Sequence, residues 1–290
     1  MILKVDNSVF VDGNNAFDVS QSAFGTTLEV PLQNTFTTSS RFVTIDYESN
    51  RMFVTLANTV NVFNATTLAY ISTITQAGGS FNNPMGMCVD NANNRLLVCN
   101  NGNSTVSVIN LTTLALISVI TTAGGNFSGV ISVVFDANFY YFLNRTSKNV
   151  VVLKRTDLSF DATILGTSGD FTSIQSNYLG IDIQAGIVYV PASQMILLLN
   201  TTTRQTTRVV IWGKDFKECC VDKVNNRLLV SDHVNNSVLS YNLSNFAENF
   251  SFVLQGSNTN NGGLTIDYPN SRIFYCQSAL NKIEIIKFKN

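Results

Sequence analysis

The chain has a single histidine, His233, which follows Asp232 and is the one imidazole available for chemistry. One histidine excludes every metal site built from several imidazole ligands. Nucleophilic catalysis by a Ser–His–Asp triad would need a serine held beside His233, and no pattern in the sequence marks one. Asp232 and His233 are therefore interpreted as residues of a surface loop.

Aspartates recur at intervals of 40 to 46 residues and mark an internal repeat. Around them, short apolar segments such as 95–99 and 106–109 are bounded by turn residues, which predicts β-strands. Residues 64–81 and 110–127 agree at 13 of 18 positions. A period of about 40–45 residues with four strands per unit predicts an all-β fold, a β-propeller whose repeats each form one blade. The marker aspartates are Asp46, Asp90, Asp136, Asp182, Asp222 and Asp267.

Two motifs within the repeat resemble known families. The pattern Pro84-x-Gly86-x-x-Val89-Asp90 resembles the NHL repeat. Residues 94–100 followed by 105–110 are similar to the YVTN repeat of bacterial and archaeal surface propellers, and residues 225–232 repeat this second motif. The resemblance covers residues 41–290 and implies a propeller fold without a specific function.

The N-terminal region allows two arrangements. In the favoured one, the protein has six four-stranded blades, and a strand at residues 28–32 closes the ring as the fourth strand of the last blade. Residues 1–26 then form an arm, and residues 27–290 form the propeller. In the alternative, residues 3–6 open a degenerate seventh blade.

Composition narrows the classes of partner. Charged residues make up 13% of the chain and the formal net charge is −1, which argues against nucleic-acid binding through a basic face. No apolar run approaches the ~18 residues of a membrane span. Residues 1–6 carry charges where a secretory signal needs an apolar core, so no signal peptide is expected. The sequence leaves the location open between the cytoplasm and a virion or cell surface reached by a signal-independent route.

The five cysteines are expected to be small core residues rather than disulfide partners. Cys88 and Cys220 each stand two residues before a marker aspartate, and Cys99 and Cys276 each stand nine after one. Equivalent repeat positions and an odd number of cysteines argue against a disulfide framework. Cys219, beside Cys220, has no counterpart in the other repeats.

The resemblance implies one enzymatic alternative. Lactonases of the gluconolactonase type are similar in fold and hold a divalent cation with Glu, Asn and Asp around the central channel. Carried over to this chain, Glu218, Asn144 and Asp232 would bind a calcium ion and make the protein a metal-dependent hydrolase. The marker aspartates recur in every repeat, however, which favours hydrogen bonds within turns over a single metal site.

The favoured prediction is a non-catalytic module for binding or assembly, without a cofactor. A weakly charged surface rich in Asn, Ser and Thr suits hydrogen bonds to protein or glycan, within a larger homo- or hetero-assembly such as a surface layer or a virus particle. The binding residues are expected on loops after the second strands and before the inner strands. They are Asn100, Asn101, Asn144, Arg145, Lys214, Asp215, Asp232 and His233.

Overall fold

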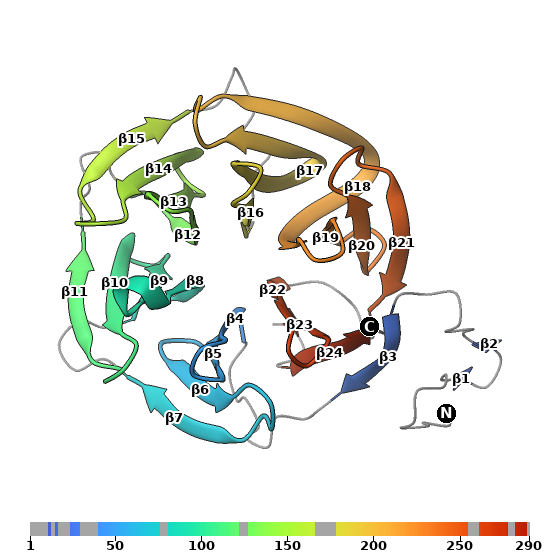
Figure 1. Ribbon diagram of the computed structural model, residues 1–290, viewed down its shortest axis with the longest axis horizontal. Helices are drawn as coiled ribbons and strands as arrows, with labels where there is room; N and C mark the ends of the chain where they lie inside the picture. The colour runs from blue at the N-terminus through green and yellow to red at the C-terminus, as the bar shows by residue number, and fades with distance from the viewer. Residues whose placement is uncertain are drawn as a thin grey trace.

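The computed structural model shows an all-β chain whose sheets follow one another around a central axis (Figure 1). It describes residues 11–12, 15–16, 24–29, 40–75, 81–121, 127–165, 178–254, 261–277 and 282–288. In each main sheet the strands run antiparallel, from an inner strand at the axis to an outer strand at the perimeter. This is the arrangement of a β-propeller.

Five main sheets build the ring. The first sheet contains β4 (Phe42–Asp46), β5 (Arg51–Thr55), β6 (Val60–Asn64) and β7 (Tyr70–Ile74). The second contains β8 (Pro84–Asp90), β9 (Arg95–Asn100), β10 (Thr105–Asn110) and β11 (Leu116–Ile120). The third contains β12 (Val130–Phe135), β13 (Phe139–Asn144), β14 (Asn149–Lys154) and β15 (Phe160–Ile164).

The fourth sheet has six strands: β16 (Gly180–Asp182), β17 (Ile187–Asn200), β18 (Thr206–Asp222), β19 (Arg227–Asp232), β20 (Ser237–Asn242) and β21 (Glu248–Val253). The fifth contains β22 (Asn261–Asp267), β23 (Arg272–Gln277), β24 (Lys282–Phe288) and β3 (Phe24–Glu29). A separate two-stranded sheet pairs β1 (Val11–Asp12) with β2 (Asn15–Ala16).

The prediction of six separate four-stranded blades is wrong, because the fourth and fifth repeats share one sheet. The start of β17 pairs with β16, as in Gly180 with Tyr189, and its end pairs with the start of β18, as in Met195 with Val210. The end of β18 then pairs with β19. β17 and β18 are thus each one long strand. The corresponding segments of the other repeats are divided into two separate strands. No seventh main sheet occurs among the described residues, and residues 3–6 lie outside them.

The marker aspartates close the turns between first and second strands, as the repeat pattern predicted. Their carboxylates accept backbone N–H bonds from the turn at 2.8–3.2 Å in Asp46, Asp90, Asp136, Asp182 and Asp222. The turn then needs a left-handed residue, and Asn50, Asn94, Gly186, Asn226 and Ser271 occupy it with φ of 50–64°. We call the side of the ring that carries these turns the hairpin face.

The last sheet packs against the first. A core cluster joins Val43 and Val54 of the first sheet to Phe274 and Ile285 of the fifth. Arg272 donates hydrogen bonds across this junction to the carbonyl of Ala65. Arg51 makes the same kind of bond, at 2.7 Å, to the carbonyl of Leu111 in the second sheet.

The outer position of the fifth sheet is taken by the N-terminal strand β3, which pairs antiparallel with β24. The register matches Ile285 with Leu28 and Ile286 with Thr27. The strand spans Phe24–Glu29 instead of the predicted residues 28–32, so it begins within the segment assigned to the arm. That this strand is needed to close the ring stays a prediction.

The second and third strands of each repeat form most of the core. Cys99 and Cys276 lie in second strands, whereas Cys88, Cys219 and Cys220 lie in inner strands. All five thiols are free, and Cys88, Cys99, Cys219 and Cys276 are buried as expected. Cys220, predicted to be equally buried, is only half-buried. Among the described residues, no helix has the length and apolar character that crossing a bilayer requires.

Candidate functional site

The side of the ring opposite the hairpin face carries the connections after the second strands and before the inner strands; we call it the loop face. Four of the eight predicted binding residues meet there in the fourth sheet. Lys214 and Asp215 come from β18, whereas Asp232 and His233 end β19 and begin the following turn. The antiparallel pairing of Phe216 with Asp232 brings the two segments together.

Asp232 holds this cluster in shape. Its fully buried carboxylate accepts the backbone N–H of Asp215 at 3.1 Å and the side-chain amide of Asn235 at 2.6 Å. The ammonium of Lys214 lies 3.5 Å from the same carboxylate. The backbone N–H of His233 donates to the carbonyl of Asp215 at 2.9 Å. Asp232 is thus the internal support of the two loops, and the charges nearer the surface are those of Lys214 and Asp215.

Sequence reasoning missed two members of the cluster, Ser231 and Lys217. The hydroxyl of Ser231 donates to the carboxyl of Glu218, and Lys217 pairs with Asp215 at 3.0 Å. The sequence did contain a sign of Ser231, because this polar residue ends the apolar run 228–230 and directly precedes Asp232. Lys217 and Glu218 likewise place charges in an inner strand. Arg41 stands at the position of Lys217 in the first repeat, but no other repeat has a charge at the position of Glu218.

Glu218 is completely buried beside the ring axis. Burial raises the pKa of its carboxyl well above the ordinary value, although the hydrogen bond from Ser231 acts in the opposite direction. Its Oε2 atom lies 3.8 Å from Nε2 of His233, beyond hydrogen-bond distance. Burial of the imidazole, with the nearby Lys217 ammonium as a second cause, lowers the pKa of His233 to about 4. At neutral pH this histidine is uncharged, and Ser231 is bonded to the carboxyl group instead of to the imidazole.

The other four predicted residues do not join this cluster. Asn100 is buried in the second sheet and donates to the hydroxyls of Thr105 and Ser107. Asn144 is buried in the third sheet, where it accepts the backbone N–H of Ser128 at 3.2 Å and donates to Asn149. Both side chains fasten loops within their own repeat. Asn101 is half-buried and Arg145 is exposed.

The cluster has an exposed aromatic neighbour, Trp212, the single tryptophan of the chain. Its side chain is 79% exposed. The register between β17 and β18 shifts between Ser193 and Met195, so four residues of β18 bulge out opposite one residue of β17. Trp212 lies in this bulge, and Gly213 turns the chain with φ of 74°. A tryptophan held in water beside polar groups is typical of interaction surfaces.

The loop face offers few side chains that could bind a metal ion. In the part of the chain that the structure describes, no three His, Cys, Asp or Glu side chains group closely enough to hold a metal. Of the calcium ligands that the lactonase resemblance implies, Asn144 and Asp232 use their oxygens on their own loops. Only Glu218 keeps an oxygen, Oε1, without a hydrogen-bond partner among the described residues.

Sheets arranged around an axis and turns fastened by a repeated aspartate define this chain as a β-propeller. Residues 81–109, which contain β8, β9 and most of β10, match the family model of the NHL repeat. The resemblance inferred from Pro84–Asp90 is confirmed in that segment, and the propeller carries a repeat of the NHL type. The likeness of other segments to the YVTN repeat stays a prediction. A search of curated proteins finds no match to this sequence.

Proposed function

We propose that this protein is a non-catalytic binding module that recognises protein or glycan through its loop face. The observation that supports this most directly is Trp212, exposed in a bulge two residues before Lys214 and next to the cluster of Asp215, Asp232 and His233. Tryptophan supplies a rigid apolar surface at a small entropy cost, and side chains of this type dominate the binding energy of many interfaces.

The polar neighbours suit the same role. Lys214 and Asp215 offer a donor and an acceptor beside the indole, and the pairs with Asp232 and Lys217 hold them in place. A partner with an apolar surface and hydroxyl or amide groups would fit this arrangement, as a sugar ring or a polypeptide does. A weakly charged surface further supports a role within a larger assembly.

The test is a binding screen on glycan and peptide arrays with the wild type and two variants. Trp212→Ala and Lys214→Glu should weaken each hit at least tenfold. Phe160→Ala, on the perimeter, and Lys154→Glu, at the hairpin face, are the matched controls and should bind like the wild type. Equal binding by Trp212→Ala and the wild type would refute the proposed surface. Charge reversal at Asp232 is unsuitable, because a fully buried carboxylate that supports two loops would be lost.

A metal-dependent hydrolase of the lactonase type is the second candidate, supported by the unpartnered oxygen of buried Glu218. The aromatic rings of Phe42 and Tyr178, with centroids 4.8 Å apart, meet at the axis near this residue and leave little room for a substrate. A calorimetric titration with calcium distinguishes the binding module from the metal-dependent hydrolase. Calcium binding that is lost in Glu218→Gln, together with lactone hydrolysis, would make the enzyme the better interpretation.

A further inference from the structure

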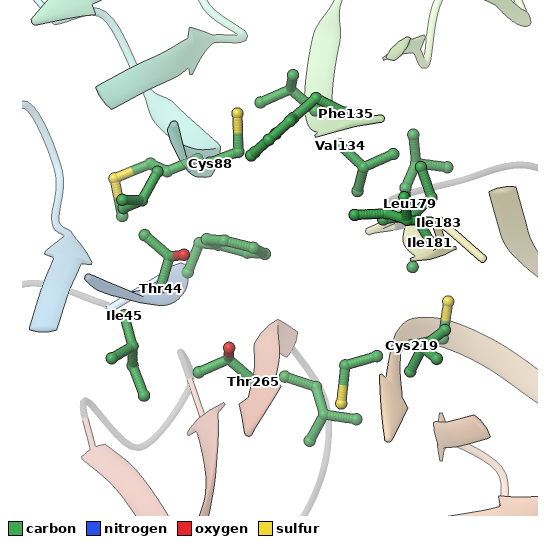
Figure 2. Close-up of a pocket in the computed structure, with 18 residues that line it drawn as sticks. Thr44, Ile45, Cys88, Val134, Phe135, Leu179, Ile181, Ile183, Cys219 and Thr265 are labelled. Atoms are coloured by element: carbon green, nitrogen blue, oxygen red, sulfur yellow. The ribbon is translucent and has the colours of Figure 1, made fainter. Parts of the chain in front are cut away.

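A cavity of about 250 Å³ lies on the ring axis between the inner strands (Figure 2). Its walls come from all five main sheets. Each repeat contributes at least one half-exposed side chain to it from its inner strand. Taken one from each repeat, six of these side chains are Thr44, Val89, Val134, Ile181, Val221 and Thr265.

The cavity has a floor on the side of the loop face. Phe42 and Tyr178 come from the first and fourth repeats, on opposite sides of the axis, and their rings meet there with centroids 4.8 Å apart. The hydroxyl of Tyr178 reaches Met85 Sδ of the second repeat at 3.8 Å. Tyr178 and Met85 are buried, and Phe42 is 9% exposed.

Hydrogen bonds between neighbouring inner strands draw the ring together at the same level. Gly263 donates to the carbonyl of Arg41 at 2.7 Å, and Tyr178 donates to the carbonyl of Lys217 at 2.9 Å. Leu179 donates to the hydroxyl of Ser132 at 3.0 Å. These bonds lie at the starts of the inner strands. The cavity therefore opens at the other ends of these strands, toward the hairpin face.

The side chains of the wall are mostly apolar up to the mouth, and backbone groups between them add polar surface. In Figure 2 the side chains of Val134, Phe135 and Ile181 lie along one side of the cavity, across from Thr44 and Thr265. Ile183, at the rim, is 56% exposed. Among the 18 lining residues the oxygen-bearing side chains are two threonines, and none is charged. Three thiols, from Cys88, Cys219 and Cys220, complete the wall.

Water fits this space poorly. At ~30 Å³ per molecule the cavity would hold about eight waters, which have few side-chain partners here for the hydrogen bonds that ordered water requires. Burying the valine and isoleucine side chains of the mouth under an apolar occupant removes unfavourable apolar surface from water. Isolated exposed apolar residues are common, but a concave space lined mainly by apolar side chains with a few polar groups is typical of a ligand site.

We propose that this central cavity binds one small, uncharged, apolar molecule, which enters from the hairpin face. Its volume suits a small ligand of about a dozen non-hydrogen atoms and lies just below the ~300 Å³ at which typical ligand pockets begin. The two threonine hydroxyls allow one hydrogen-bonding group on the ligand. A charged group is disfavoured, because no side chain of opposite charge lines the wall and burial of an unpaired charge is costly. This site is distinct from the loop face and does not depend on its function.

The direct test is a fluorescence titration with 1-naphthylamine, uncharged at neutral pH, and with its 5-sulfonate derivative, which carries one negative charge on an added sulfonate group. The uncharged probe should bind at one molecule per chain, at least tenfold more tightly than the sulfonate. Equal binding of the two probes, or several molecules per chain, would overturn the proposal.

Variants locate the site. Thr265→Trp and Thr44→Trp each fill the mouth and should weaken binding of 1-naphthylamine at least tenfold. Thr207→Trp makes the same change at an exposed position of β18 on the perimeter and should leave binding unchanged. A filled variant that melts like the wild type but binds the probe as tightly would overturn the proposal.

A third measurement uses the wild-type protein, so its result does not depend on whether a variant folds correctly. Half-buried Cys220 lines the cavity, so a molecule bound there should shield its thiol. Saturating 1-naphthylamine should slow modification of Cys220 by N-ethylmaleimide at least fivefold, measured by peptide mass spectrometry. An unchanged rate of modification would show that the probe binds elsewhere.

Discussion

At the scale of single residues, the Asp90–Arg155 ion pair shows how a marker aspartate serves more than its own turn. Asp90 is fully buried in the second sheet, and Arg155 reaches it from the third sheet at 2.5 Å. Arg155 also lies over the ring of Phe135, 4.7 Å from its centroid. Burial favours the neutral acid, but hydrogen bonds from Arg155, Tyr140 and Asn93 outweigh it and hold the pKa of Asp90 well below its ordinary range.

We expect Arg155→Met to lower the free energy of unfolding by about 3 kcal/mol at pH 7, because it leaves a buried carboxylate without its cation. An aspartate with a depressed pKa stabilises the fold above its unfolded pKa of ~3.9 and loses this contribution at lower pH. The difference from wild type should therefore shrink as pH falls below ~3.9, as urea unfolding would measure. Arg204→Met, at the partly exposed pair with Asp161, should cost under ~1 kcal/mol. A pH-independent difference would contradict this account.

His233 gives a second prediction at this scale. Its pKa is about 4 in the folded chain and ~6.5 in the unfolded chain, so the unfolded chain binds a proton first as pH falls. Stability should decrease from pH 6.5 to pH 4, by up to ~1.4 kcal/mol per pH unit from this residue, and His233→Gln should lack that part of the decrease. The single imidazole gives one Hε1 resonance in NMR, whose titration should have its midpoint near pH 4. A midpoint near pH 6.5 would mean that the ring is solvated.

At the scale of elements, the outer strands are where the sheets meet solvent. The outer strand of the fifth sheet is β3, from the opposite end of the chain, and it covers the edge of β24. In Figure 1 it lies beside β24 at the perimeter. A sheet edge without a partner presents free N–H and C=O groups to other chains.

Deleting residues 1–33 removes β3 and should promote aggregation and lower the melting temperature, because β24 is left with an open edge. Deleting residues 1–23 is the matched control, since it removes β1 and β2 and keeps β3. Light scattering and thermal melting would measure both effects. A monomeric Δ1–33 protein with unchanged melting would show that β3 is not needed for ring closure.

At the scale of the whole molecule, the same polar contact recurs between sheets. Arg51 bridges the first and second sheets, Arg95 bridges the second and third through the carbonyl of Arg155, and Arg272 bridges the fifth and first. The contact at the junction of the two chain ends is thus of the same kind as the internal ones. Stability should therefore be shared around the ring.

Arg272→Met and Arg51→Met should then destabilise the protein by similar amounts, about 2–3 kcal/mol each, because both arginines also pair with a buried marker aspartate. Unfolding should remain a single transition in both variants, followed by circular dichroism in the far ultraviolet for the strands and in the near ultraviolet for the buried tyrosines. An effect of Arg272→Met below a third of that of Arg51→Met, or two separate transitions, would show that the last sheet is held weakly.

The sequence by itself determined the repeat, the all-β class and the turn chemistry. These depend on local patterns. Short apolar segments alternate with turn residues, an aspartate accepts N–H bonds within its own turn, and an asparagine such as Asn94 tolerates a left-handed backbone. A NHL-type repeat could be recognised for the same reason. The residues that act within one hairpin lie close together in the sequence, so their spacing is informative.

Only the tertiary structure decided how the repeats combine and which side chains are available to a partner. Asn100 and Asn144 look like binding residues in sequence but fasten their own loops, whereas Trp212 becomes prominent through a bulge that no local pattern shows. The continuous strands β17 and β18 likewise depend on pairing between repeats. The apolar cavity requires six inner strands to converge, and the Phe42–Tyr178 contact joins residues 136 positions apart. Such features depend on long-range packing, which a repeat spacing does not encode.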